Sequence, residues 1–238
     1  PTGDEGDWRN LTRSGGSAER APAWSPDGRH LAWFSDASGE YRLMIGTQDG
    51  LEPPRAIDLP DPTFYYPPTW SPDGRHLVFT DEGRTLWIVA VESGEATRVD
   101  GDAFAVPERS LSPVWSPCSG WIAYARRLDS RMRAIMLYSL ETGEITQVTD
   151  GMADAWSPAF DASGDHLWFL ASTTVGLASG WLDLSSLDRT VTAGLYAVLL
   201  RDDVDSPLAP TLGDEPVRAS EDEDAEGAAA EGGASPPE

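Results

Sequence analysis

The chain has 238 residues, of which 40% are hydrophobic, and a formal net charge of −23. This length and composition are sufficient to bury the core of one globular domain or of a run of repeats. The negative charge repels the phosphates of nucleic acids and anionic membrane surfaces, so we expect neither as a partner. No stretch approaches the ~18–20 apolar residues that a membrane span needs.

One phrase, built around Trp-Ser-Pro-Asp-Gly, recurs along the chain. Its copies span Pro22–Phe34, Pro68–Thr80, Pro113–Ala125 and Pro158–Leu170. Their anchoring aromatic residues are Trp24, Trp70, Trp115 and Phe160, which lie 46, 45 and 45 residues apart. A period of this length is typical of a β-propeller blade of about four short strands. The sequence therefore predicts an all-β propeller with four-stranded blades.

Each unit predicts a turn followed by three strands, because Pro, Asp and Gly suit a tight turn and the residues after it are rich in β-branched and aromatic side chains. The strand directly after the turn is expected to be buried, at Leu31–Phe34, Leu77–Thr80, Trp121–Ala125 and Leu167–Leu170. A second strand is expected at Tyr41–Ile45, Thr85–Val91, Ala134–Leu140 and Leu195–Leu200. A third is expected at Arg55–Asp58, Ala96–Val99 and Ile145–Val148. The strand that carries the anchoring aromatic residue completes the blade.

The pattern divides the chain into three parts. Residues 1–16 are expected to end a preceding blade, because residues 8–12 resemble the strands that close the later units. Residues 17–212 hold four blades, and residues 213–238 are expected to be a disordered acidic linker without periodicity. We expect a longer polypeptide with a ring of six or seven blades, seven in the main hypothesis, of which this chain holds about four. A complete four-bladed ring is the alternative.

The fourth unit contains a long insertion at residues 171–194, and insertions of this length commonly form interfaces or functional loops. Trp156 and Trp181 lie outside the repeat phase and are candidates for an interface, whereas the anchoring Trp residues are expected in the core. Residues 126–133 concentrate four arginines in an otherwise acidic chain: Arg126, Arg127, Arg131 and Arg133. A solvated hairpin loop and a contact with a peptide carboxylate are both open for them.

No catalytic, cofactor-binding or metal-binding residue is expected. The three histidines, His30, His76 and His166, occupy one repeat position, so the rotation between blades separates them. Asp27 and Asp73 are expected to form turns rather than an acid/base pair. Cys118 is the only cysteine, which excludes an intrachain disulfide, and it stands where two other repeats have Asp.

The Trp-Ser-Pro-Asp-Gly repeats resemble the WD40-like propeller units of the TolB family, of prolyl oligopeptidase relatives and of tricorn proteases. A further set of strings is similar to the second, seven-bladed propeller of tricorn proteases, over residues 8–212. These strings are Arg9–Arg13, Phe34–Tyr41, Met132–Leu140, Thr149–Met152, Trp181–Ser186 and Tyr196–Arg201. Cys118 departs from the Asp that is usual at its position.

This resemblance implies a non-catalytic segment of a serine peptidase, because none of the family's catalytic positions falls in this stretch. The propeller would conduct short peptides toward a PDZ-like and a catalytic domain further along the same polypeptide. The resemblance also implies that homo-oligomers can form and favours the cytoplasm, with the periplasm as the alternative. Two rival hypotheses are a TolB-like scaffold that binds a protein partner and a propeller of the prolyl oligopeptidase type.

Overall fold

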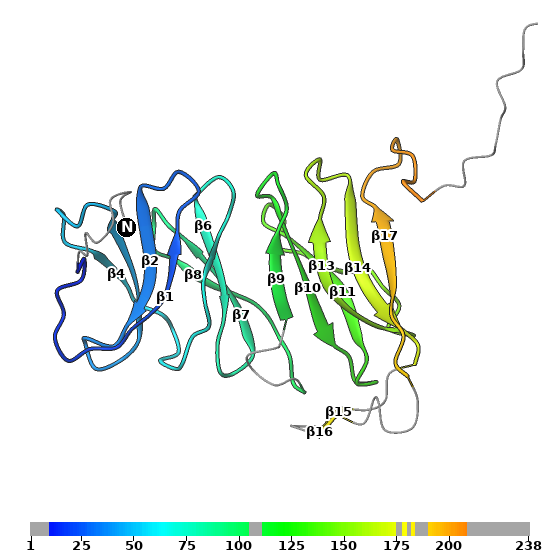
Figure 1. The fold of residues 1–238 in the computed structure, drawn as a ribbon, viewed down its shortest axis with the longest axis horizontal. Helices are drawn as coiled ribbons and strands as arrows, with labels where there is room; N and C mark the ends of the chain where they lie inside the picture. The colour runs from blue at the N-terminus through cyan, green and yellow to red at the C-terminus, as the bar shows by residue number, and fades with distance from the viewer. Residues whose placement is uncertain (1–9, 105–110, 175–177, 180–181, 184–189, 209–238) are drawn as a thin grey trace, which may run out of the picture. The chain divides into compact units, whose positions relative to one another are not determined.

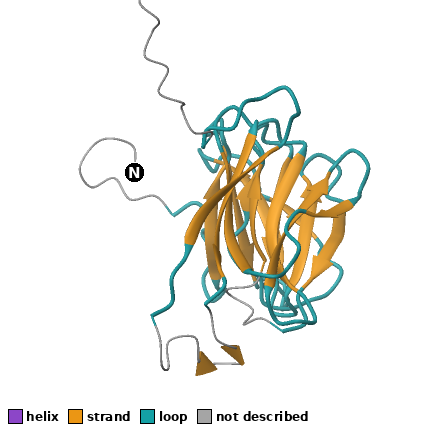
Figure 2. Ribbon diagram, turned by 90° about the vertical axis from the view of Figure 1, so that its right-hand side faces the viewer, coloured by secondary structure: helices purple, strands orange, loops and turns teal. Residues whose placement is uncertain are grey.

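A computed structural model describes residues 10–104, 111–174, 178–179, 182–183 and 190–208. The described residues up to 204 form one compact unit, and the chain divides there from the residues that follow. The first unit contains four antiparallel sheets of three or four strands, which follow one another in chain order and lie side by side (Figure 1), and one short two-stranded sheet. The described residues are strands and loops only, without a helix (Figure 2).

The first three sheets are four-stranded, with neighbouring strands paired in chain order. Blade 1 consists of β1 (Glu19–Trp24), β2 (His30–Ser35), β3 (Arg42–Thr47) and β4 (Arg55–Ile57). Blade 2 consists of β5 (Thr69–Trp70), β6 (His76–Thr80), β7 (Thr85–Ala90) and β8 (Ala96–Gly101). Blade 3 consists of β9 (Leu111–Trp115), β10 (Trp121–Arg127), β11 (Arg133–Ser139) and β12 (Ile145–Gln147). The predicted strands of these blades are confirmed.

Blade 4 has three strands among the described residues. They are β13 (Asp154–Phe160), β14 (His166–Ser172) and β17 (Gly194–Leu199). The short pair β15 (Ala178–Ser179) and β16 (Leu182–Asp183) lies within the predicted insertion, most of which is outside the described residues. The structure thus contains four consecutive blades in an open arrangement, as expected for part of a propeller ring.

The predicted boundaries at residues 16 and 212 stay predictions. Residues 8 and 9, in the remnant expected from a preceding blade, lie outside the described residues, and residues 10–18 precede β1 without forming a strand. The acidic linker predicted for residues 213–238 also lies outside the described residues.

Hydrophobic side chains fill the space between successive blades. Phe34 of blade 1 stacks on Tyr65 and meets the edge of Phe79 in blade 2, with ring centroids 5.0 and 5.3 Å away. Tyr124 belongs to the cluster between blades 2 and 3, and Phe169 to the cluster between blades 3 and 4. Blades 1–3 are hydrophobic on both faces, because the strand after the turn buries most of its side chains. This confirms the predicted burial in blades 1–3, except at Trp121, which is 42% exposed; in blade 4, Trp168 and Leu170 are only partly buried.

The first strands of neighbouring blades contact one another, β1 with β5 and β9 with β13, so they lie nearest the axis around which the blades are arranged. Three of these strands contain a β-bulge opposite the second strand. The bulges contain residues with positive φ, at Ala21 (52°), Ser112 (41°) and Ser157 (53°). Bulges re-aim the side chains and peptide groups of a strand. The bulged positions therefore shape the inner wall of the ring.

Candidate functional site: the junctions between blades

The anchoring Trp residues connect one blade to the blade before it. Trp70 Nε1 donates to the carbonyl oxygen of Ala23 at 3.1 Å, and Trp115 Nε1 donates to the carbonyl oxygen of Thr69 at 3.1 Å. Trp70 is buried and Trp115 is partly buried, which agrees with the predicted core position. Trp24 is 54% exposed, so its assignment to the core was wrong. The physical reason is that no described blade lies on the side of blade 1 that carries Trp24.

Arg126 belongs to a polar group that joins blades 2 and 3. Its Nη1 lies 2.9 and 3.1 Å from the two carboxylate oxygens of Asp100 in β8. Asp100 also accepts a 2.6 Å hydrogen bond from the hydroxyl of Tyr124, a side chain that is fully buried. Burial raises the pKa of Tyr124 well above its usual range, and the neighbouring Asp100 carboxylate raises it further. The hydroxyl therefore remains protonated and available as a donor.

Arg133 forms the corresponding connection between blades 3 and 4. Its Nε and Nη2 donate to the two oxygens of Asp154 at 3.0 and 2.5 Å, and its backbone N donates to the same carboxylate at 2.8 Å. The guanidinium also lies over the ring of Trp156, 4.8 Å from its centroid. A two-point pair of this kind fixes orientation as well as charge. Arg133 and Trp156 thus stabilise the junction between these blades.

The other two predicted arginines have no ion pair within the described residues. The backbone N of Arg127 donates a hydrogen bond to Asp102 Oδ2 at 3.2 Å. Arg131 is exposed and lies over the ring of Phe104, 4.0 Å from its centroid. A contact of these arginines with a peptide stays a prediction. Trp181 lies outside the described residues.

The turn aspartates do what the pattern predicts. Asp27 accepts hydrogen bonds from Ser25 Oγ and the backbone N of Arg29, at 2.6 and 3.0 Å, and the first of these bonds is the main cause of its lowered pKa. Asp73 makes the same contacts with Ser71 and Arg75 in the next blade. Burial opposes the lowering of its pKa, but these hydrogen bonds prevail. Both carboxylates are therefore engaged in building the turn.

The three histidines begin the second strands of blades 1, 2 and 4, and Cys118 lies in the first turn of blade 3. His76 packs against Trp115 of the next blade, with centroids 6.2 Å apart, and His166 Nδ1 lies 2.9 Å from Asp161 Oδ2. Cys118 is exposed, and a contact with Ser116 Oγ at 3.3 Å lowers its pKa. Among the described residues, no three His, Cys, Asp or Glu side chains are grouped so that they could hold a metal ion.

The described residues include no helix that is long and apolar enough to cross a membrane.

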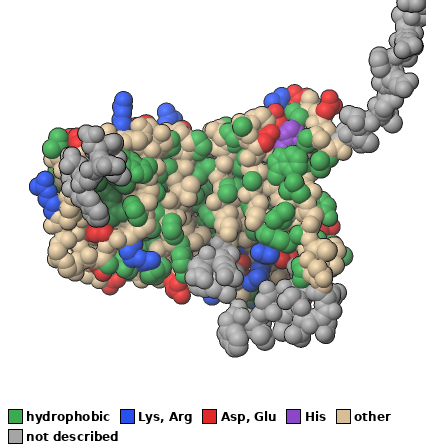
Figure 3. All heavy atoms as spheres, viewed as in Figure 1, with side chains coloured by type: hydrophobic (Ala, Val, Ile, Leu, Met, Phe, Trp, Pro, Cys, Tyr) green, Lys and Arg blue, Asp and Glu red, His purple; other side chains and the backbone are tan. Residues whose placement is uncertain are grey.

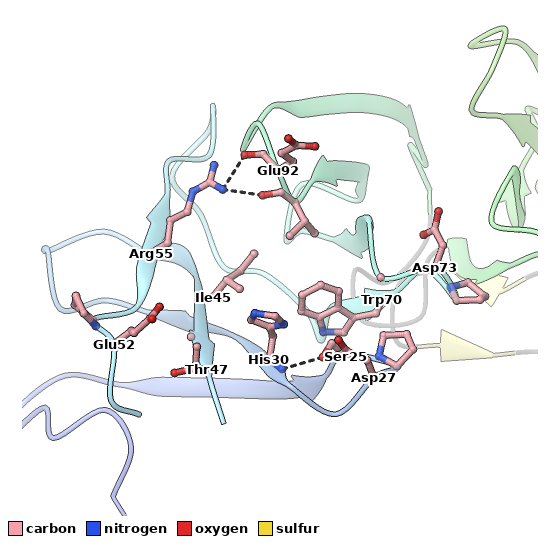
Figure 4. Close-up of a pocket in the computed structure, with 16 residues that line it drawn as sticks. Ser25, Asp27, His30, Ile45, Thr47, Glu52, Arg55, Trp70, Asp73 and Glu92 are labelled. Atoms are coloured by element: carbon pink, nitrogen blue, oxygen red, sulfur yellow. Dashed lines mark hydrogen bonds between the residues drawn. The ribbon is translucent and has the colours of Figure 1, made fainter. Parts of the chain in front are cut away.

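A cleft of about 510 Å³ opens at the junction of blades 1 and 2 (Figure 4). Its volume falls in the range of small-ligand sites. Blade 1 contributes the first turn, the end of β3 and the loop before β4, and blade 2 contributes its first turn and the residues after β7. Ile45 and Trp70 supply apolar surface, and Arg55 and Glu52 lie toward the outer side. Analysis of the sequence missed this cleft.

Arg55 closes one wall of the cleft. Its Nη1 donates to the carbonyl oxygens of Val91 and Glu92 in blade 2, at 2.8 Å each. Gly94 lies beneath the guanidinium, since an ideal Cβ at Gly94 would be 2.7 Å from Arg55 Nη2. Gly94 belongs to the Glu-Ser-Gly-Glu segment between β7 and β8, and nothing nearby in the sequence indicates its contact with blade 1.

The side-by-side blades of antiparallel strands define this protein as a β-propeller protein. The crystal structure of the tricorn protease is similar, with a TM-score of 0.61 and 17% identity over 76% of this chain and 18% of that chain. Oligogalacturonate lyase from Vibrio parahaemolyticus is similar with a TM-score of 0.50 and 13% identity, over 63% of this chain and 44% of that chain. At these identities the likeness establishes the fold alone.

The chain belongs to the family of tricorn protease second β-propeller domains, whose family model matches residues 2–235. This confirms the resemblance inferred from the sequence. The "Uncharacterized peptidase YuxL" of Bacillus subtilis (strain 168) is 31% identical over 70% of this chain and 25% of its own length. "Tricorn protease homolog 1" of Streptomyces coelicolor is 28% identical over 69% of this chain and 16% of its own length. The chain thus spans a quarter or less of these relatives.

Proposed function

We propose that this chain is a non-catalytic propeller segment of a tricorn-like serine peptidase, and that it guides short peptides toward an active site elsewhere in the same polypeptide. Family membership supports this proposal, and the two relatives described above carry the names of a peptidase and a tricorn protease homolog. The partners are then the peptides and the PDZ-like and catalytic domains of the polypeptide. We further propose a cytoplasmic location, with the periplasm as the alternative that cell fractionation would reveal.

The observation that carries the guiding role is the chemistry of the inner strands. The residue three positions before each anchoring aromatic residue is small or uncharged: Ala21, Pro67, Ser112 and Ser157. The residue directly before the aromatic is also uncharged: Ala23, Thr69, Val114 and Ala159. On the face seen in Figure 3, charged side chains gather toward the two ends of the strands and the band between them is mainly uncharged. Such a wall lets peptides pass without holding them by charge.

The test is to narrow the passage along these inner strands in the complete protein. Ser157→Arg places a long cationic side chain at an exposed bulged position with φ of 53°, and Arg131 shows that arginine adopts positive φ in this chain, at 70°. We expect hydrolysis of peptides of about ten residues to slow several-fold, with little change for a fluorogenic dipeptide. Thr146→Arg on the outer strand β12 is the matched control. Unchanged hydrolysis by the Ser157 variant, or equal loss with both variants, would contradict the guiding role.

The alternative function is a scaffold that binds a protein partner. One observation favours it: β17 leaves Leu195, Tyr196 and Leu199 exposed by 60%, 49% and 41%. In a ring this strand would pack against further parts of the propeller, and in a scaffold against a partner. Purified complete protein that fails to hydrolyse any peptide in a mixed library would favour the scaffold.

A further inference from the structure

The cleft between blades 1 and 2 is rich in carboxylates. Asp27, Glu52, Asp73 and Glu92 line it, together with a single guanidinium, that of Arg55. A cleft lined by one sign of charge raises the local concentration of oppositely charged ligands. The cleft therefore favours a cation.

The charge of these carboxylates is not cancelled within the cleft. Arg55 directs its Nη1 to two backbone carbonyl oxygens, and no ion pair within the described residues joins it to a carboxylate. Asp27 has one long contact with the exposed Arg29, at 4.0 Å. Glu52 and Glu92 are exposed and take part in no ion pair of the described chain. These two glutamates are the acceptors available to a ligand.

An apolar surface lies beside the carboxylates. Ile45 and Trp70 are exposed by 9% and 7% and both line the cleft. The hydrogen bond from Trp70 Nε1 to Ala23 fixes the indole in place. A rigid indole next to carboxylates suits a side chain with an aliphatic stem and a cationic end, since the stem packs on apolar surface and the cation interacts with the ring and the acids.

The junctions on the two sides of blade 2 differ at one turn residue. In blade 3, Ser119 occupies the positive-φ position of the turn, and its Oγ accepts a 3.0 Å hydrogen bond from the backbone N of Asp73 in blade 2. In blade 2 the same position is Gly74, which has no side chain to reach blade 1. An ideal Cβ there would meet only Pro26, at 3.9 Å. The bridge that joins blades 2 and 3 is therefore missing between blades 1 and 2.

We propose that this cleft binds the Arg or Lys side chain of a peptide, with its stem against Trp70 and Ile45 and its charge in the negative field to which Glu52 and Glu92 contribute. Asp27 and Asp73, already engaged by Ser25 and Ser71, contribute to the negative field. This inference rests on the proposed function, because it takes the cation to be a side chain of a peptide that the propeller guides. It assigns to the propeller a preference for basic peptides, at a place separate from the inner wall.

The test compares two labelled hexapeptides, one with a single Arg among Ala and Ser, and one with citrulline in its place, by fluorescence anisotropy. Citrulline keeps the shape of Arg and removes its charge. We expect the Arg peptide to bind about ten-fold more tightly, and the difference to vanish in 1 M salt, where charges are screened beyond about 3 Å. The double variant Glu52→Gln/Glu92→Gln should reduce the difference to about two-fold or less, in line with a few-fold for each exposed pair.

The matched control is Glu141→Gln/Glu144→Gln in blade 3, where Glu141 is the counterpart of Glu92. It removes the same charge elsewhere and should leave the preference unchanged. Gly74→Ser should weaken binding by restoring the bridge seen at Ser119, at a position where Ser119 shows that serine is accommodated. Equal binding of both peptides, or equal loss in the control variant, would overturn the proposal. Because the Ser157 test measures passage along the inner strands, and the peptide-binding test measures binding at the cleft, the guiding role can stand if this inference fails, and the reverse also holds.

Discussion

The indole N–H of Trp70 donates to the backbone carbonyl of Ala23 in the preceding blade, at 3.1 Å. The same relationship recurs one blade later, between Trp115 and Thr69, again at 3.1 Å. The repeat thus encodes a contact between blades as well as the strands within a blade. Trp24 is the equivalent residue of blade 1 and is mostly exposed.

Replacement of Trp70 by Phe should test this contact. The variant keeps an aromatic side chain but loses the donor and some buried volume, so we expect unfolding to become easier by about 1–2 kcal/mol. Urea denaturation followed by circular dichroism measures the change. Trp24→Phe in the same chain should change stability by less than about 0.5 kcal/mol, because an exposed substitution of this kind removes little. A loss of equal size at both positions would show that the hydrogen bond between blades is not the cause.

Asp100 should be the residue on which the junction of blades 2 and 3 depends most. Asp100→Ala leaves the buried Tyr124 hydroxyl and the guanidinium of Arg126 without their acceptor, which we expect to cost about 2–3 kcal/mol. Tyr124→Phe removes only the hydroxyl and should cost about 1 kcal/mol. In a double-mutant cycle the two costs should fall short of additivity by about 1 kcal/mol. Additive costs would mean that the hydroxyl and the carboxylate do not interact energetically.

The repeat made the blades predictable, because every unit repeats both the turn residues and the hydrophobic strand after them. The repeat could not predict the exposure of Trp24. Trp70 and Trp115 each pack against a preceding blade, and no described blade precedes Trp24. The roles of Arg126 and Arg133 were equally out of reach. Their partners, Asp100 and Asp154, lie 26 and 21 residues away in adjacent blades, and no local pattern specifies the register between two sheets.

The cleft escaped sequence analysis for a similar reason. Gly74 follows the turn pattern, and Ser119 is the residue that departs from it. In the structure that departure adds a bridge between blades 2 and 3, and the ordinary glycine leaves the preceding junction open. The turn residue therefore sets the contact with the neighbouring blade as well as the local backbone conformation.

The stability of blade 4 should decrease in acid through Asp161. Hydrogen bonds from His166 and then Ser163 hold the pKa of this carboxyl far below its usual range. A carboxyl whose pKa is lowered by folding stabilises the protein above its unfolded pKa, which is about 4, and loses this contribution as the pH falls toward its folded pKa. Asp161→Asn should therefore flatten the decline of the melting temperature between about pH 5 and pH 2. Asp129→Asn, at an exposed loop residue, is the control and should leave that decline as it is in the unsubstituted chain.

Gly94→Ala should weaken the junction of blades 1 and 2. Gly94 has φ of 76°, where an L side chain costs about 1 kcal/mol, and its added Cβ would lie 2.7 Å from Arg55 Nη2. The guanidinium must then move from the carbonyl oxygens of Val91 and Glu92, at a further cost of about 1 kcal/mol. Gly143→Ala supplies the matched control, because Gly143 occupies the same turn of blade 3 with φ of 71° and has nothing within 4 Å of its ideal Cβ.

The difference in unfolding free energy between these two alanine variants isolates the contact between the blades from the cost of the backbone conformation. We expect Gly94→Ala to be the more destabilising by about 1 kcal/mol in urea titrations. In an Arg55→Ala background the two variants should become equal, because the clash and the displaced hydrogen bonds have both been removed. If the difference persists in that background, Arg55 is not the element that Gly94 accommodates, and the closure of this wall of the cleft has another origin.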